Sequence, residues 1–430
     1  MHRGRILRLP SDVLCSIIMD CRLPIEARSE ARRLMSDTEQ FPTSIKRLKA
    51  SGPESRLSIL VVTQWHIGDL IQTFPALRDL RNAYPQAHIT AFINSFPASL
   101  LEGCPYIDRV VKGFDIDYNK TPLARLRFYW RAARTFLAPL KRFDMVIMLT
   151  PPPRSILLLS HLAGARKILS FEKGPGSDLG RLARLLTHNL GVAERTMSDR
   201  LRSIAPLQAL GIPTSPHYDP ISWISESAKE QTRALLARYG VSGPYVVFHP
   251  GCHWGCNEWE DERWAELGDL VQEQIGSRIV ITGTQEEFPK ARRIVGMMKK
   301  PAINLTGRTS LLDFVNCITG AQLLVGVDGA QTQIALAQKT PAVILFGADS
   351  PIRIGLQPGE KMAVVRRWAG PDFPGHLDPH CHLARGSCHH PDCRAERTLS
   401  KITVADVWAE VQRVIGDVKT FDVRRSTFDV

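Results

Sequence analysis

The residue best placed to do chemistry in this sequence is Asp69, which stands at the end of a short glycine turn. An apolar run at 57–62 precedes the turn and is typical of a strand buried on both faces of a parallel sheet. After Asp69, apolar residues recur at helical spacing, and open α/β sheets bind their ligands where a strand gives way to a helix. A carboxylate here can act as a general base or as the N-cap of the helix, and the spacing leaves both roles open.

A second turn from strand to helix carries polar residues near position 328. The strand predicted at 323–327 leads into a run of small and polar residues that opens an alanine-rich helix: Asp328, Gly329, Ala330, Gln331, Thr332 and Gln333. A helix N-terminus offers free backbone N–H groups and the positive end of the helix dipole, and small residues let an anion approach. The turn is therefore a candidate diphosphate site, with an ordinary structural turn as the alternative.

The loop 249–259 follows another predicted strand and combines glycines with His and Cys. A single Cys-x3-Cys pair, Cys252 and Cys256, beside two His residues is a weak metal signal. Contact between a glycine-rich loop and a substrate is the favoured interpretation. It makes His249, Gly251 and Asn257 candidate substrate-binding residues.

A denser cluster lies near the C-terminus, where residues 380–393 hold three Cys and four His. Cys381, Cys388 and Cys393 are weak candidate ligands for a structural zinc or iron. The alternative is a loop that is merely rich in these residues. The chain has nine Cys, an odd and scattered set, so a disulfide framework is not expected.

Positive charge is concentrated in one part of the chain. The net charge is +12, of which residues 56–215 contribute +10, residues 1–55 contribute +3 and residues 216–430 contribute −1. Within this part, the segment 120–142 mixes seven basic residues with aromatic and aliphatic ones, which is typical of contact with an anionic lipid surface. A core-facing apolar stripe with a solvated basic face is the alternative. No motif for nucleic-acid binding, GxGxxG or GxxxxGK occurs, so no nucleic-acid partner is expected.

Two α/β halves must position these residues. Strands alternate with helices from residue 57, including one helix predicted over 69–83, and the pattern restarts with a strand at 245–248. We predict an N-terminal extension (1–55), a first domain (56–215) and a second domain (216–430) that ends in the Cys/His-rich tail and a helix at 404–415. The proline-rich stretch 211–230 joins them. No long apolar window or signal peptide is evident, so we expect a cytoplasmic protein, with peripheral contact to an inner membrane as an option.

The chain from about 57 to 415 resembles the heptosyltransferase family, glycosyltransferase family 9. The resemblance rests on short motifs that occur in the same order along the chain: Ile67-Gly68-Asp69, Phe74-Pro75-Ala76-Leu77-Arg78, Tyr84-Pro85, His249-Pro250-Gly251, Trp259 with Trp264, Thr282-Gly283, Asn304-Leu305-Thr306-Gly307, Asp328 before an Ala-rich helix, and Phe346-Gly347.

The resemblance implies a GT-B architecture of two facing Rossmann-like domains, with a nucleoside diphosphate sugar held mainly by the second. It implies an inverting transfer without metal or cofactor, from ADP-heptose to a lipopolysaccharide core or other glycan. Asp69 then becomes the general base, with His66 and Gly68 as substrate contacts beside it.

The chain departs from the family pattern at two positions in the implied donor site. Asn257 stands where the family usually has Lys or Arg, and Gln333 stands where it usually has His. Two further interpretations therefore stay open. One is a member that binds a nucleotide sugar without turnover, and the other is a protein glycosyltransferase whose Cys/His tail holds a metal.

Overall fold

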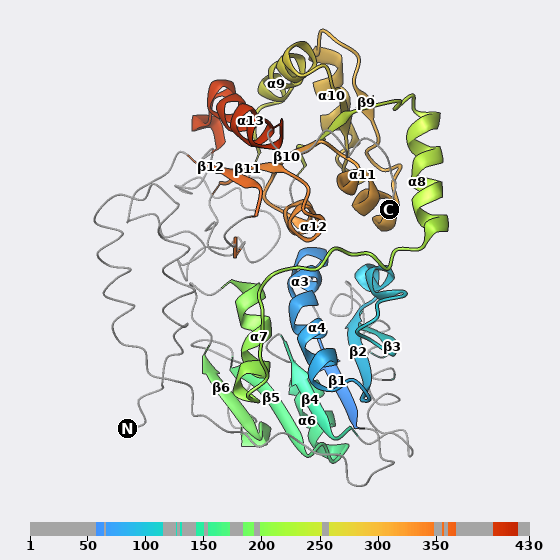
Figure 1. Ribbon diagram of the computed structural model, residues 1–430, viewed down its shortest axis with the longest axis vertical. Helices are drawn as coiled ribbons and strands as arrows, with labels where there is room; N and C mark the ends of the chain where they lie inside the picture. Colours follow the sequence, from blue (N-terminus) through green and yellow to red (C-terminus); the bar gives the residue numbers. More distant parts are fainter. Residues whose placement is uncertain are drawn as a thin grey trace, which may run out of the picture. The chain divides into compact units, whose positions relative to one another are not determined.

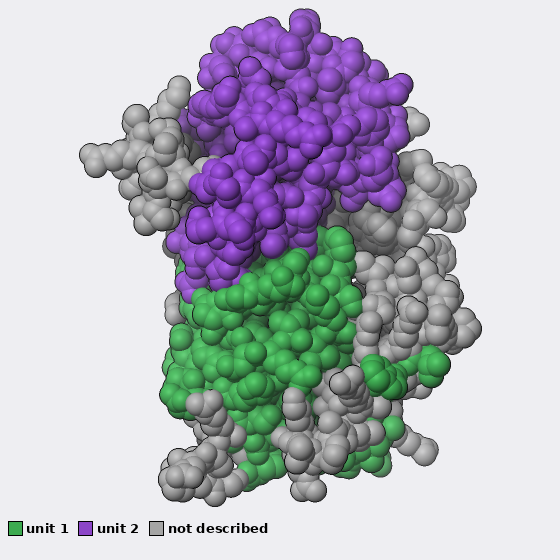
Figure 2. Space-filling view, turned by 90° about the vertical axis from the view of Figure 1, so that its right-hand side faces the viewer, with its two compact units in different colours: residues 1–218, 352–359 green, residues 219–351, 360–430 purple. Residues whose placement is uncertain are grey.

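The computed structural model describes residues 57–63, 66–114, 126, 130, 143–149, 154–172, 184–192, 198–251, 258–347, 355, 356, 360–366 and 399–419. The chain forms two compact units, coloured in Figure 2. Unit 1 is Met1–Tyr218 with Ile352–Gly359, and unit 2 is Asp219–Pro351 with Glu360–Val430. The chain thus leaves unit 1 within the stretch 211–230 and returns to it once, for a short segment.

Unit 1 is built on a six-stranded parallel sheet with the order β3-β2-β1-β4-β5-β6 (Figure 1). This is the strand order of a Rossmann fold, and it places the carboxyl end of β1 at the point where the order reverses. The strands are β1 (Ser58–Val62), β2 (His88–Asn94), β3 (Arg109–Phe114), β4 (Met145–Met148), β5 (Lys167–Glu172) and β6 (His188–Val192).

Helices cover both faces of the unit 1 sheet. On one face α6 packs Ile156 and Leu157 against Leu60 and Val62 of β1 and against Val146 and Met148 of β4. Because side chains alternate along a strand, Ile59 and Val61 point to the opposite face. The elements are α3 (Ile67–Gln72), α4 (Phe74–Ala83), η1 (Phe96–Leu101), α6 (Arg154–Leu162) and α7 (Asp199–Ala209), and α7 packs on α3 and α4.

Unit 2 repeats the same topology. Its parallel sheet has the order β12-β11-β10-β7-β8-β9, which is again the Rossmann order with β7 as the first strand. The strands are β7 (Tyr245–His249), β8 (Arg278–Ile281), β9 (Ile303–Asn304), β10 (Leu323–Val327), β11 (Ala342–Leu345) and β12 (Met362–Val365). The predicted α/β class with two parallel sheets is confirmed.

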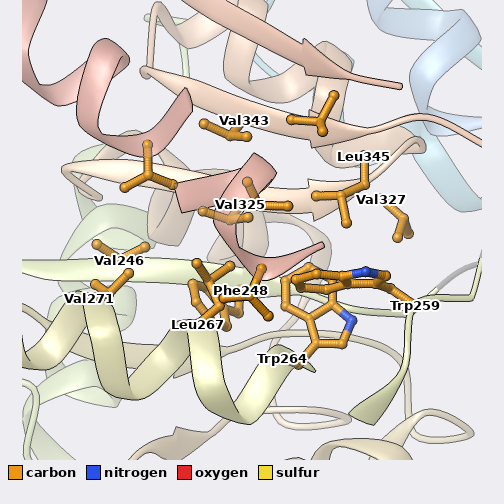
Figure 3. Packing of buried hydrophobic residues seen from close by; sticks show 14 of the residues in the cluster. Val246, Phe248, Trp259, Trp264, Leu267, Val271, Val325, Val327, Val343 and Leu345 are labelled. Carbon is orange, nitrogen blue, oxygen red and sulfur yellow. The ribbon is translucent and has the colours of Figure 1, made fainter. Parts of the chain in front are cut away.

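The unit 2 core is anchored by two tryptophans (Figure 3). The rings of Trp259 and Trp264 meet edge to face at 5.1 Å, and Trp264 meets Phe248 of β7 at 5.3 Å. The Trp259 Nε1–H donates to the carbonyl of Ile402 at 2.9 Å, which ties the C-terminal segment to the sheet. The helices of unit 2 are α8 (Glu226–Arg238), α9 (Asp261–Gln274), α10 (Phe288–Met297), α11 (Leu311–Thr319), α12 (Ala330–Gln338), η7 (Leu399–Lys401) and α13 (Val404–Lys419).

The structure differs from the sequence-based prediction in several elements. The helix predicted over 69–83 is two helices, α3 and α4, which meet at Thr73. Pro75 lies at the start of α4, where its missing N–H costs least, so a new helix begins there. The prediction also omitted β5, β6, β12 and α8. No helix of the described residues is long and apolar enough to cross a bilayer.

Candidate active site

Asp69 lies in the first turn of α3, directly beyond the carboxyl end of β1. His66 is the N-cap, α3 begins at Ile67, and Asp69 is the third helical residue. The backbone N–H of His66 donates to Asp69 Oδ2 at 3.0 Å. The N-cap interpretation of Asp69 was therefore wrong in position, because the helix starts two residues earlier than the apolar periodicity indicates. The carboxylate still supports the first turn, as the acidic member of a capping box does.

One carboxylate oxygen of Asp69 thus accepts a hydrogen bond from the backbone. Asp69 itself is half-buried, and it lies beside the exposed His66 and the half-buried Gly68. A bond from a backbone N–H fixes the orientation of a carboxylate. Such a group at the switch point of a Rossmann sheet can accept a proton from a hydroxyl that is brought to it.

The far end of α3 is fastened to α7. The backbone N–H of Arg200 donates to Gln72 Oε1 at 3.0 Å, and Ser203 Oγ donates to the Gln72 carbonyl at 3.0 Å. Both Gln72 and Ser203 are buried. Because Gln72 is three residues beyond Asp69 on the same short helix, α7 fixes the helix that carries the carboxylate.

In unit 2 the predicted residues meet at the carboxyl ends of two neighbouring strands. β7 pairs with β10, and His249 at the end of β7 lies opposite Gly326, two residues before Asp328. The structure therefore brings His249 and Gly251 together with the run Asp328–Gln333, although about 80 residues of sequence separate them. The carboxyl ends of adjacent parallel strands are where a Rossmann unit binds its ligand.

The His249 imidazole is held by a hydroxyl and an aromatic ring. Its Nδ1 lies 3.0 Å from Thr282 Oγ1, and its ring centre lies 5.1 Å from that of Phe314. Burial lowers the pKa of His249, while the negative charge of Glu287 works in the opposite direction. The ring is accordingly held in its neutral form over most of the physiological pH range.

Glu287 is a residue of this site that the sequence analysis missed. It is the N-cap of α10, and its Oε2 accepts the Thr284 N–H at 2.6 Å. The carboxylate occupies the space above Gly251 and Gly283: a Cβ on Gly251 would collide with Glu287 Oε1, and one on Gly283 would lie 2.5 Å from Oε2. A larger residue at either position would displace the Glu287 carboxylate from the backbone it lies against.

Beyond the carboxyl end of β10, the start of α12 is packed with buried polar side chains. Gln331, Thr332 and Gln333 are all buried, and Gln331 Nε2 donates to the carbonyl of Val327. The Gly329 N–H donates to Thr332 Oγ1 at 3.3 Å, and Thr332 Oγ1 lies 3.4 Å from Asp328 Oδ1. The side chains thus tie down the turn, and the first backbone N–H groups of α12 face out of the helix end.

Several predicted residues lie outside the described part of the chain. They are Asn257, the Cys252/Cys256 loop, the extension 1–55, the candidate metal ligands Cys381, Cys388 and Cys393, and most of segment 120–142. No group of three His, Cys, Asp or Glu placed to bind a metal occurs within the described ranges. The metal and Asn257 interpretations stay predictions.

Comparison with known proteins places the chain in one family. The model of glycosyltransferase family 9 (heptosyltransferase) matches residues 136–375, more than half of the chain. The chain is 25% identical over 358 residues to lipopolysaccharide heptosyltransferase 3 of Escherichia coli K12, covering 81% of this chain and 96% of that protein. It is also 25% identical over 303 residues to lipopolysaccharide heptosyltransferase 1 of Pseudomonas aeruginosa, covering 69% and 80%.

Two solved structures share the fold. A glycosyl transferase family 9 protein from Veillonella parvula superposes with a TM-score of 0.68 at 20% identity, covering 84% of this chain and 97% of that one. E. coli heptosyltransferase WaaC with ADP-2-deoxy-2-fluoro heptose gives 0.60 at 17% identity, covering 83% and 99%. Two Rossmann units, an acidic residue at the first strand end and the family match lead to one conclusion: the chain is a glycosyltransferase of the GT-B fold that belongs to family 9, the heptosyltransferases.

Proposed function

We propose that this enzyme transfers heptose from ADP-heptose to a lipopolysaccharide core or other glycan acceptor, with inversion at the anomeric carbon. Membership of the heptosyltransferase family supports heptose transfer in lipopolysaccharide synthesis. The observation that carries the mechanism is the Asp69 carboxylate, oriented by the His66 N–H at the end of β1.

In this mechanism Asp69 takes the proton of the acceptor hydroxyl as its oxygen attacks the anomeric carbon. The bond from that carbon to the diphosphate oxygen breaks, and the electron pair leaves with ADP. A single displacement from the face opposite the leaving group inverts the configuration, and one positioned base suffices for it. We assign no metal to this step, because backbone amides can stabilise the charge on the leaving diphosphate.

Unit 2 supplies groups suited to each part of the donor. The N-terminus of α12 presents N–H groups and the positive end of the helix dipole to the diphosphate. Glu287 follows the second strand of its Rossmann unit, the position at which an acidic residue accepts hydrogen bonds from ribose hydroxyls. We therefore assign the ribose to Glu287 and the diphosphate to the turn that begins at Asp328.

We place the reaction at the cytoplasmic face of an inner membrane. A lipopolysaccharide acceptor is anchored by its lipid, so an enzyme that acts on it works at a bilayer surface. The concentration of positive charge in residues 56–215 suits an anionic surface of this kind.

The direct test uses purified protein, ADP-heptose and a lipopolysaccharide acceptor that lacks the terminal heptose. We expect release of ADP and a matching mass increase of one heptose on the acceptor, with the glycosidic linkage inverted relative to the donor. GDP- and UDP-sugars serve as controls for donor identity. Absence of transfer with every donor and acceptor pair would contradict the assignment.

A second candidate function is nucleotide-sugar binding without turnover. It is favoured by Gln333, a buried amide at a position where His is usual in the family. The two functions differ in a simple observation. A binding protein is stabilised against heat by its nucleotide sugar but releases no ADP in the presence of acceptor.

A further inference from the structure

The helix that carries Asp69 is too short to fix its own orientation. α3 has six residues, fewer than two turns, and isolated helices shorter than about 12–15 residues are marginal in water. Its orientation must therefore come from packing, and α7 lies beside it and beside α4 (Figure 1). Buried hydrogen bonds join α3 to α7 at the end of α3 that follows Asp69.

Gln72 is the residue of α3 that binds the first turn of α7. Its Oε1 accepts the backbone N–H of Arg200, the second residue of α7, and such N–H groups have no acceptor within their own helix. Ser198, the N-cap, accepts the N–H of Leu201 at 3.2 Å. Gln72 and Ser198 therefore cap α7 together, and both are buried. A shift of Gln72 would leave a buried N–H without an acceptor, so α3 and the first turn of α7 are held to one arrangement.

The same turn of α7 holds both segments through which the chain passes between the units. The guanidinium of Arg200 lies over the ring of Tyr218, the last residue of unit 1 before the first crossing, and it donates to the carbonyl of Gly355 in the returning segment. Gly355 also packs against the N-cap, because a Cβ on Gly355 would lie 2.5 Å from Ser198 Oγ. One turn of α7 thus contacts both connections and α3.

We propose that the first turn of α7 couples these two connections to the catalytic base, with Arg200 and Gln72 as positioning residues for Asp69. With Tyr218 and Gly355 in place on Arg200, the turn is fixed, its N–H meets Gln72, and α3 keeps the Asp69 carboxylate in place. When Gly355 is displaced, the turn and α3 shift together. A misplacement of about 1 Å at a reacting group can cost about 100-fold in rate. The kinetic part of this proposal rests on the proposed function, in which Asp69 is the base.

Gly355→Ala tests the coupling from its remote end. The added Cβ collides with the buried Ser198 hydroxyl, so the returning segment must withdraw from the first turn of α7. Gly164→Ala is the matched control, since both glycines belong to unit 1 and their φ values of +69° and +73° give the two variants similar backbone strain. A Cβ on Gly164 meets nothing within 4 Å. The difference between the variants therefore measures the effect of the collision.

Hydrogen exchange of the full-length protein reads the structural step without any substrate. Amides of α3 should exchange several-fold faster in Gly355→Ala than in wild type, because local opening becomes easier when α3 loses its support. Gly164→Ala should exchange like wild type at α3. Amides of α9, in unit 2, should be protected equally in all three proteins. Equal exchange at α3 in the two glycine variants would overturn the coupling.

Steady-state kinetics reads the consequence for the base. Gly355→Ala should lower kcat by about tenfold or more, and so should Gln72→Met, which removes the acceptor for the Arg200 N–H. ADP affinity should not change, because the groups assigned to the donor lie in unit 2. Gln72→Glu keeps an oxygen that can accept the Arg200 N–H and should retain most of the turnover.

A mutant cycle with Asp69→Asn separates positioning from a general loss of structure. If the first turn of α7 acts through Asp69, Gly355→Ala and Gln72→Met should lower kcat by less than about twofold once the base is already gone. An equal loss in both backgrounds would show that they act independently of Asp69 and would overturn the proposal. Faster exchange of α3 in Gly355→Ala, in a protein that transfers sugar from no donor, would uphold the coupling and overturn only the proposed reaction.

Discussion

The guanidinium carbon of Arg200 lies 4.4 Å from the centre of the Tyr218 ring, in a side chain with no exposed surface. The same guanidinium donates to the carbonyl of Gly355. Tyr218 is the last residue before the chain enters unit 2, and Gly355 belongs to the segment that returns from it. One buried cation therefore fastens both of these segments to unit 1, while its backbone N–H holds the end of α3.

Replacing this cation should destabilise unit 1. In Arg200→Met the Gly355 carbonyl loses its donor in a buried position, which costs about 1–3 kcal/mol. Arg308→Met is the matched control, because Arg308 also lies over a tyrosine ring, Tyr239 at 5.4 Å, but is exposed. We expect a loss below about 1 kcal/mol there. Urea unfolding of both variants measures the difference, and equal losses would contradict it.

Asp69→Asn separates the two roles of this residue. The amide oxygen can still accept the His66 N–H, so the first turn of α3 is kept while the base is lost. If Asp69 is the general base, kcat should fall by about 10²–10⁴-fold. ADP affinity and the unfolding midpoint should be unchanged. Steady-state kinetics and calorimetric titration make the test, and near-normal kcat would reduce Asp69 to a structural role.

Glu287→Gln probes the assignment of the donor ribose. A glutamine keeps the shape of the side chain and an oxygen for the Thr284 N–H, but it removes the charge that strengthens a hydrogen bond from a hydroxyl. We expect roughly tenfold weaker binding of ADP, the difference between a charged and a neutral acceptor. Binding of a ribose-free diphosphate should not change. A variant that binds ADP like wild type would exclude the ribose contact.

Gly329→Ala tests the diphosphate turn. A Cβ at this position would lie 2.6 Å from Gln331 Oε1, so the buried carboxamide must shift away from its bond to Val327. We expect ADP binding to weaken several-fold, because both the approach to the α12 N-terminus and its packing change. Gly296→Ala is the control, since a Cβ there meets nothing within 4 Å. Titration of both with ADP decides whether the turn holds the ligand.

Stability should fall as the pH drops below about 6.5, the ordinary value for histidine. Burial lowers the pKa of His249 in the folded state, so the unfolded chain binds more protons in this window. The contribution is complete above pH 6.5, is lost toward the folded-state pKa and levels off below it. Thermal unfolding of His249→Gln between pH 8 and 5 should show a shallower slope. His188 contributes in the same direction from unit 1, so a residual slope is expected.

Sequence alone predicted the parts of the fold that have a strong periodic signal. The central strands β1, β4, β7 and β10 are continuous apolar runs because both their faces are covered. The edge strand β6 escaped prediction because its sequence, HNLGV, has little apolar character and contains Gly191 at φ +73°. The pairing register of β5 with β6 also shifts near this point. The sequence of β6 therefore lacks the regular alternation of apolar and polar residues that predicts a strand.

The site was predicted only where each residue has a local signal. Asp69, His249 and Asp328 follow apolar strands, and the strand order then brings the last two together. Glu287 has no such signal, because its role depends on lying over Gly251, which is 36 residues earlier in the chain. A local clue existed in Thr284-x-x-Glu287, a helix-start pattern that follows directly after the glycine of a strand end.

The return of Ile352–Gly359 to unit 1 has a consequence for how this protein is made. During synthesis the ribosome releases the sheet of unit 1 long before Gly355, the acceptor for the buried Arg200, has been translated. The last contact of unit 1 must therefore wait until β7 to β11 of unit 2 have emerged, although N-terminal domains generally fold first. A fragment that stops at residue 218 would keep a nascent unit 1 permanently at that stage, with Arg200 lacking its Gly355 partner.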